Sequence, residues 1–246
     1  MAQISDDLYL GNAPTLIAGP DSVGNPGGLG VGPLGRIYTY DIVPLTLQAA
    51  GLASSQNPAS GGSFTLTAGT GVTTVVDLNG VTRYVLDVPR AVSITAAGAN
   101  TATYLVSGYD TYGQPLTQSL AAPSTSTVTT LKAFKSVVSI TNLNATAGTN
   151  GLTVGYRDVF GLPWRVTDAG YIVSVKWAGA LADDAGTFVA AVTTDPNTAA
   201  LGDVRGTYTP SSAANGTRRL LVHISLPAIA SGPFATRTGA LGVTPA

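Results

Sequence analysis

The sequence predicts an all-β protein, with a β-sandwich or jelly-roll-like body, an extended N-terminal arm and little helix. The chain has no Glu, only three Lys and one Met, so the straight-chain residues that favour helices, apart from Arg and some Leu and Gln, are scarce. Gly, Pro and Asn interrupt it at short intervals, as turns do. Between the turns, apolar residues recur at every second position, the period of half-buried strands; they include Leu86, Val88, Val92, Ile94, Phe134, Val138, Ile140, Leu152, Val154 and Tyr156.

This pattern divides the chain into four parts. Residues 1–36 are rich in Gly and Pro and show no periodicity, so they form either a mobile tail or an extended arm laid on a neighbour. Residues 37–163 form the predicted β-sandwich body. Residues 164–227 carry further strand patterns, in the same sandwich or in a second subdomain, and residues 228–246 are expected to form a C-terminal tail.

Turn chemistry predicts two local features of the body. Asn79-Gly80 lies between apolar runs and predicts a hairpin that pairs residues 72–78 with residues 81–88 through a type I′ turn. Pro89-Arg90 then interrupts the alternation, which predicts that a strand ends there.

Composition excludes several classes of function. Twelve Lys and Arg residues are scattered and the net charge is -1, so a nucleic-acid partner is not expected. No apolar run reaches the roughly eighteen residues of a membrane helix. Asp6 and Asp7 stand where a secretory leader carries basic residues, so no leader is expected. Because the mean hydropathy is +0.28 and charges are few, we expect faces that become covered on assembly.

No catalytic or metal-binding constellation is evident, so neither an enzyme nor a cofactor is predicted. Asp183-Asp184, with Asp195 and Asp203, offers carboxylates for calcium or for glycoside hydrolysis. Their spacing matches no calcium loop, however, and Asp in loops rich in Ala and Gly usually bonds its own backbone. The alternative is that these carboxylates bind a structural cation that bridges two subunits.

His223 is the only histidine of the chain. It lies on the strand face opposite Leu220, Val222 and Ile224, which are expected to face the core. No nucleophile and no orienting partner can be assigned to it from the sequence. We therefore expect a surface or interface histidine.

Two segments carry side chains suited to a protein or sugar partner. One is a short apolar patch within the N-terminal arm. The other is a loop with two tyrosines and a carboxylate, which is either displayed for binding or folded onto the sandwich as a hairpin turn. The candidate partner-binding residues are Leu8, Tyr9, Leu10, Tyr109, Asp110 and Tyr112.

Four segments resemble virion structural proteins of tailed bacteriophages, and the similarity covers about the last two thirds of the chain. They are VSGYDTYGQPLTQSL (residues 106–120), KAFKSVVSITNL (residues 132–143), DVFGLPWRV (residues 158–166) and DVRGTYTPSSAANGTRRLLVHI (residues 203–224).

This resemblance implies an all-β capsid decoration (cement) protein that binds the major capsid protein and has no enzymatic residues. The expected state is a homo-oligomer, with a trimer favoured, in a virion assembled in the cytoplasm of a host bacterium. The alternative is a tail, fibre or head-tail component that binds a receptor or glycan through Tyr109 and Tyr112. A polysaccharide depolymerase that uses the Asp pairs is a third, weaker hypothesis.

Overall fold

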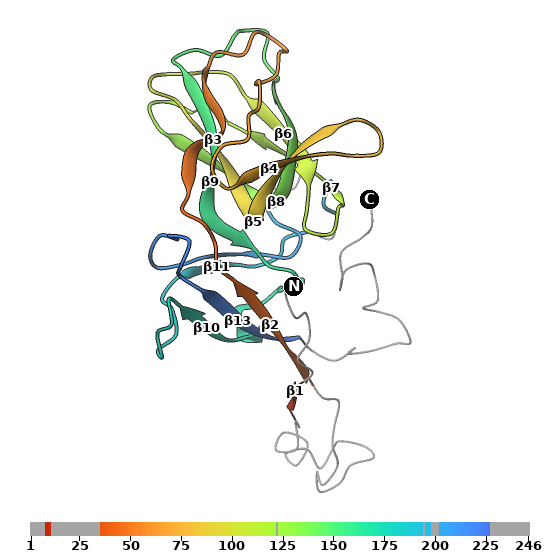
Figure 1. Ribbon diagram of the computed structural model, residues 1–246, viewed down its shortest axis with the longest axis vertical. Helices are drawn as coiled ribbons and strands as arrows, with labels where there is room; N and C mark the ends of the chain where they lie inside the picture. Colours follow the sequence, from red (N-terminus) through yellow and green to blue (C-terminus); the bar gives the residue numbers. More distant parts are fainter. Residues whose placement is uncertain (1–7, 11–34, 122, 194, 198–201, 227–246) are drawn as a thin grey trace, which may run out of the picture.

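The protein is described by a computed structural model. The all-β prediction is confirmed: two antiparallel sheets are stacked along the long axis, and one of them curls into a sandwich-like body (Figure 1). The order of the strands within the sheets does not confirm the finer expectation of a jelly roll. Among the described residues the only helix is a 3-10 turn, Ala169–Tyr171. The description covers residues 8–10, 35–121, 123–193, 195–197 and 202–226.

The larger sheet has nine strands and supplies most of the body. Its main path runs β11-β12-β9-β5-β8-β6-β7, while β3 pairs with β9 and β4 pairs with β5. The strands are β3 (Gln48–Gln56), β4 (Val72–Val76), β5 (Thr82–Thr95), β6 (Tyr104–Tyr109), β7 (Pro115–Leu120), β8 (Thr127–Asn142), β9 (Leu152–Gly161), β11 (Thr187–Val189) and β12 (Thr207–Thr209).

The smaller sheet joins segments from the two ends of the chain. Its order is β1-β2-β13-β10, and every pair is antiparallel. The expected core positions Leu220, Val222 and Ile224 on β13 are fully buried, and they stand opposite Ile42, Tyr40 and Tyr38 on β2. The strands are β1 (Leu8–Leu10), β2 (Gly35–Ile42), β10 (Ile172–Trp177) and β13 (Leu220–Leu226).

The buried apolar side chains form two separate clusters. The large-lobe core lies inside the curled sheet and contains Leu52, Leu86, Val92, Ile94, Tyr104, Phe134, Ile140 and Tyr156 among others. The small-lobe core joins the smaller sheet to the middle of β5 and the end of β9, and contains Val88, Phe160, Trp164, Trp177, Tyr208, Leu220, Val222 and Ile224 among others.

The strand break predicted at Pro89-Arg90 is wrong. β5 continues through both residues, over fourteen residues in all, and carries side chains of both cores. Its pairing with β8 shifts register between Val85 and Arg90. Proline has no N–H to donate to a neighbouring strand. The irregular pairing at this point therefore lets Pro89 lie inside the sheet.

The predicted hairpin is present, but its turn differs from the predicted type. Val72 stands opposite Leu86 and Val76 opposite Thr82, as expected. Gly80 has a φ of 77°, whereas Asn79 is not among the residues with positive φ, so the turn is not type I′. The Gly80 N–H donates to the Asp77 carbonyl and the Asp77 N–H to the Val81 carbonyl. This is a type I turn followed by a bulge with Gly in the left-handed region.

Candidate functional site

A buried arginine joins the two cores. Arg90 has no exposed surface and lies on β5 between the large-lobe and small-lobe cores. Its guanidinium lies 4.9 Å from the ring centre of Tyr156, in the large-lobe core, and 5.1 Å from that of Phe160, in the small-lobe core. Both rings can hold a cation against their faces. Arg90 is therefore the central side chain of the junction.

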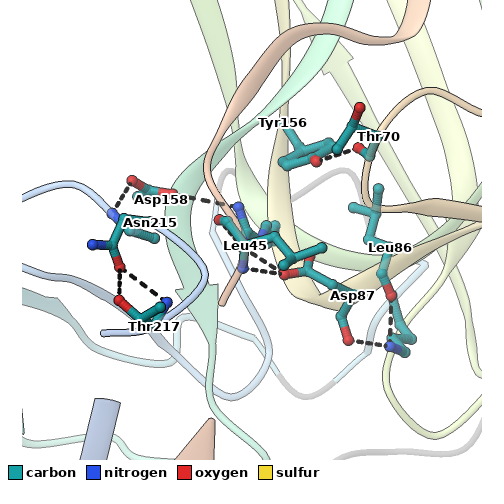
Figure 2. A network of polar contacts seen from close by, with 11 residues as sticks. Leu45, Thr70, Leu86, Asp87, Tyr156, Asp158, Asn215 and Thr217 are labelled. Carbon is teal, nitrogen blue, oxygen red and sulfur yellow. Dashed lines mark hydrogen bonds and ion pairs between the residues drawn. The ribbon is translucent and has the colours of Figure 1, made fainter. Parts of the chain in front are cut away.

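Two carboxylates neutralise this arginine and tie it to distant segments. Asp87 lies 2.7 Å and Asp158 3.4 Å from the Arg90 guanidinium, which also donates to the Leu45 carbonyl at 2.6 Å. Asp87 also accepts from the Leu45 N–H, and Asp158 from the Ala214 N–H, each at 2.8 Å (Figure 2). The network thus fixes the connection between β2 and β3 and the loop before β13.

The same network extends along β8 and β9. The Lys135 ammonium donates to the carbonyls of Leu86 and Asp87, at 2.6 and 2.9 Å. Burial lowers the pKa of Lys135, and the charge of Asp87 opposes that shift. On β9, the Tyr156 hydroxyl donates to the Thr70 carbonyl at 2.7 Å (Figure 2). Apart from the Arg90–Asp87 pair, the contacts of this network link segments far apart in the sequence, so the junction is an organising element of the fold.

A second buried ion pair holds the tyrosine-containing loop. Asp110 lies 2.7 Å from Arg205, and each side chain is 3 % exposed. Asp110 also accepts the N–H groups of Tyr112 and Gln114, so its carboxylate is turned inward and closes the β6–β7 turn.

The two tyrosines of this loop both contact an arginine. The Arg83 guanidinium lies 3.7 Å from the ring centre of Tyr109. The Arg205 guanidinium lies 4.7 Å from the ring centre of Tyr112, whose hydroxyl donates to the Pro163 carbonyl at 2.8 Å. Tyr112 still leaves 46 % of its surface exposed. Its edge is open to a partner, while its ring and hydroxyl are held by the body.

The other three candidate partner-binding residues, Leu8, Tyr9 and Leu10, form strand β1. β1 lies at the edge of the smaller sheet, with Leu8 opposite Ile37 and Leu10 opposite Gly35. The rest of the predicted arm, apart from the two β2 residues Gly35 and Arg36, lies outside the described residues.

The acidic candidates bind groups of the chain itself. Asp183 pairs with Lys176 at 2.9 Å, and Asp184 accepts from the Tyr208 hydroxyl at 2.9 Å. The hydrogen bond from Lys176 holds the pKa of the Asp183 carboxyl below its usual value. Within the described ranges, no group of three or more His, Cys, Asp or Glu side chains is placed to hold a metal ion.

Asp203 and Lys132 form a third buried polar cluster. Asp203 accepts the N–H groups of Ala133, Arg205 and Gly206. The bond from Ala133 attaches the segment that precedes β12 to β8. Burial raises the pKa of Asp203, although these hydrogen bonds oppose the shift. Lys132 donates to the carbonyls of Thr117 and Pro196, and burial lowers its pKa.

His223 is half-buried on the outer face of the smaller sheet. Its Nδ1 shares a hydrogen bond of 2.8 Å with the Ser174 hydroxyl on the neighbouring strand β10. The two residues form a polar cross-strand pair.

Comparison with known proteins adds no family to this description. No protein-family model, no curated protein and no solved structure matched the chain. Among the described residues, no helix is long and apolar enough to cross a membrane.

The residues of the junction were missed by sequence reasoning. One signal was present: Arg90 has the same strand parity as Leu86, Val88, Val92 and Ile94, so the alternation placed it on the buried face. A charged residue inside such a run needs a buried partner. The sequence offers no means of choosing Asp158 as that partner, because it lies sixty-eight residues away.

Proposed function

We propose that this chain is a structural component of a bacteriophage virion, a decoration (cement) protein that binds the major capsid protein and stabilises the shell. It acts as a homo-oligomer, is assembled in the cytoplasm of the host bacterium, and performs no catalysis. The extended arm of residues 1–36 adds contacts to those of the β body. Repeated weak contacts over a shell give strong overall attachment, because each contact becomes intramolecular once the body has docked.

One observation carries this proposal: several charged side chains are turned inward while large apolar side chains project from the body. Leu78 is 106 % and Leu181 95 % exposed. In contrast, Arg90, Arg205 and Lys132 are buried and bonded within the chain. Such a surface suits a protein that spends its working life covered by neighbours. The resemblance to phage virion proteins supplies the kind of neighbour.

The copy number of the chain tests the proposal. Quantitative mass spectrometry of purified virions should find it in hundreds of copies, comparable to the major shell protein. A few tens of copies or fewer would place it at the tail or connector and favour the receptor-binding alternative. Absence from particles would overturn the virion assignment.

The arm is tested by deletion of residues 1–34, which leaves all of β2 in place. The truncated protein should keep the circular dichroism of the folded body and lose its binding to capsids. Removal of residues 228–246 is the matched control for shortening a terminus. Unchanged capsid binding after the N-terminal deletion would contradict the role of the arm.

The glycan-binding alternative rests on the exposed edge of Tyr112. Exchange of both Tyr109 and Tyr112 for Ala should abolish binding to host cells or to a glycan array if that alternative holds. Wild-type protein that binds no glycan and no host cell would remove it.

A further inference from the structure

The β4–β5 hairpin ends in an apolar surface that no other described segment of the chain covers. We call it the hairpin tip, and it consists of Val75, Val76, Leu78 and Val81. Their exposed fractions are 49 %, 64 %, 106 % and 37 %. Val75 and Val76 are neighbours in a strand and point to opposite faces, so the hairpin is apolar on both sides. It extends sideways from the large lobe (Figure 1).

The hairpin tip is held in one conformation by polar contacts. Asp77 Oδ1 accepts the N–H groups of Asn79 and Val81, at 2.9 and 3.0 Å. Asp77 Oδ2 pairs with Arg83 at 2.8 Å, and Arg83 in turn lies against the ring of Tyr109. Leu78 lies at the end of this rigid turn and buries no surface against the described part of the chain. Because the hairpin tip already has a fixed conformation, it loses little conformational entropy when it binds a partner.

β4 also presents an open backbone edge. Because the Asp77 N–H bonds the Val81 carbonyl, the alternation of an antiparallel ladder directs the N–H and C=O groups of Val75 and Thr73 toward β5. Those of Thr74 and Val76 therefore point away from β5. Within the part of the chain that the structure describes, β4 pairs with no strand other than β5.

This edge carries none of the features that usually prevent edge-to-edge pairing. Natural edge strands are protected by Lys, Pro or a bulge. The sequence Val-Thr-Thr-Val-Val of β4 has no charge and no Pro, and every residue is β-branched. Its pairing with β5 runs without a register shift. The strand is thus a good template for one more strand.

We propose that β4 pairs antiparallel with β4 of a second copy of this chain, centred on Thr74. In that register Thr74 bonds Thr74 of the partner subunit in both directions. The Val76 N–H meets the carbonyl of Val72 of the partner subunit, whereas the Val72 N–H keeps its bond to Gly69. Each hairpin tip then lies over the neighbouring copy, and Val76 is covered.

A second copy fits this edge better than an unrelated strand for two reasons. An uncharged strand of this kind is self-complementary, so its pairing creates no like-charge contact. The contact is isologous, and it therefore closes after two subunits and leaves no β4 edge exposed. It gives a dimer, or joins pairs of trimers where a separate three-fold interface exists. The inference does not depend on the virion role and stands if that role is wrong.

Cysteine cross-linking tests the two-fold register directly, because the chain has no cysteine of its own. Thr74→Cys places one thiol at the proposed two-fold axis, at a spacing that a disulfide can bridge. With diamide as oxidant, the full-length variant should form covalent dimer at least about tenfold faster than Leu181→Cys at the same concentration. Leu181, 95 % exposed on another loop, is the matched control for random collision. Equal rates would overturn the proposal.

Proline substitution tests the edge without breaking the hairpin. The Thr74 N–H points outward, so Thr74→Pro removes a donor only from the open edge. Analytical ultracentrifugation should show a wild-type species of twice the mass of the variant, or a dissociation constant at least about tenfold higher for the variant. Val76→Lys should act in the same way, because the proposed contact would cover the new charge, and Leu181→Lys should not.

Three outcomes contradict the inference. The first is wild-type protein that stays monomeric at the highest soluble concentration. The second is a set of variants that keep the wild-type mass. The third is a Thr74→Pro variant that loses thermal stability without a change in mass, which would mean that another segment of the same chain occupies the edge.

Discussion

The guanidinium of Arg90 lies 2.7 Å from the carboxylate of Asp87, three residues earlier in the same strand, and the arginine side chain has no exposed surface. An arginine on the buried side of a strand would be costly alone, because transfer of a charge from water into the interior is strongly unfavourable. The carboxylates of Asp87 and Asp158 offset that cost. The two apolar cores can therefore share one charged junction.

Loss of this arginine should strongly destabilise the fold. Arg90→Ala leaves Asp87 and Asp158 buried without their cation, so the free energy of unfolding should fall by about 3–5 kcal/mol. Urea denaturation measures it. Arg219→Ala is the control, because Arg219 pairs with Asp41 at the surface and is 61 % exposed; its loss should cost less than about 1 kcal/mol. Similar costs for both variants would show that the junction is not special.

Removal of one buried hydroxyl should stabilise the protein. The Tyr40 hydroxyl is buried with no hydrogen-bond partner among the described residues, and burial raises its pKa. Tyr40→Phe should therefore raise the free energy of unfolding by about 1 kcal/mol. Tyr156→Phe removes a hydroxyl that donates to the Thr70 carbonyl, and should lower it by about as much. Thermal unfolding of both variants checks the opposite signs.

The ion pair of Asp110 and Arg205 should show strong coupling. It attaches the β6–β7 turn to the last third of the chain, and both side chains are nearly fully buried. A double-mutant cycle with Asp110→Asn and Arg205→Met should give an interaction energy of about 1–3 kcal/mol. Additive effects of the two substitutions would mean that the pair forms no energetic link between these segments.

The hairpin should lose stability in acid. The hydrogen bond from Arg83 is the main reason why the pKa of Asp77 lies below its usual 3.8 in the folded protein. A carboxyl whose pKa is lowered by folding contributes stability above its unfolded value and loses it as pH falls through the folded value. Between pH 5 and 2, stability should therefore fall less for Asp77→Asn than for wild type. Parallel curves would contradict this role of Asp77.

Strand pairing was accessible from the sequence where one face is buried along a whole strand. The alternation at Leu220, Val222 and Ile224 identified the buried face of β13. The pairing of β13 with β2 has no register shift, so the alternation is not interrupted. It was misleading on β8, where Val137 is fully buried and Val138 is not. A register shift opposite Ser107 and Gly108 reverses the parity there. Such irregularities depend on the partner strand, which a local pattern does not contain.

The polar clusters were less accessible for the same reason. The neighbours of Asp110 in the sequence are turn formers and left open whether its loop is displayed or folded onto the body, because its burial is decided by Arg205, far along the chain. The hairpin at Asn79-Gly80 was predicted because all its determinants are local, although the conformation of its turn was not. Local chemistry thus predicted elements, and long-range pairing decided the site.

The smaller sheet has a consequence for the order in which the protein is made. β2 is synthesised well before its partner β13, which follows every other described strand, and Asp41 meets Arg219 across 178 residues. Contacts so distant in sequence form slowly, because a long loop must close first. All nine strands of the curled body precede β13, so the body can assemble while synthesis continues. The small lobe can therefore be completed only after β13 has been synthesised, and a product truncated before β13 would lack it.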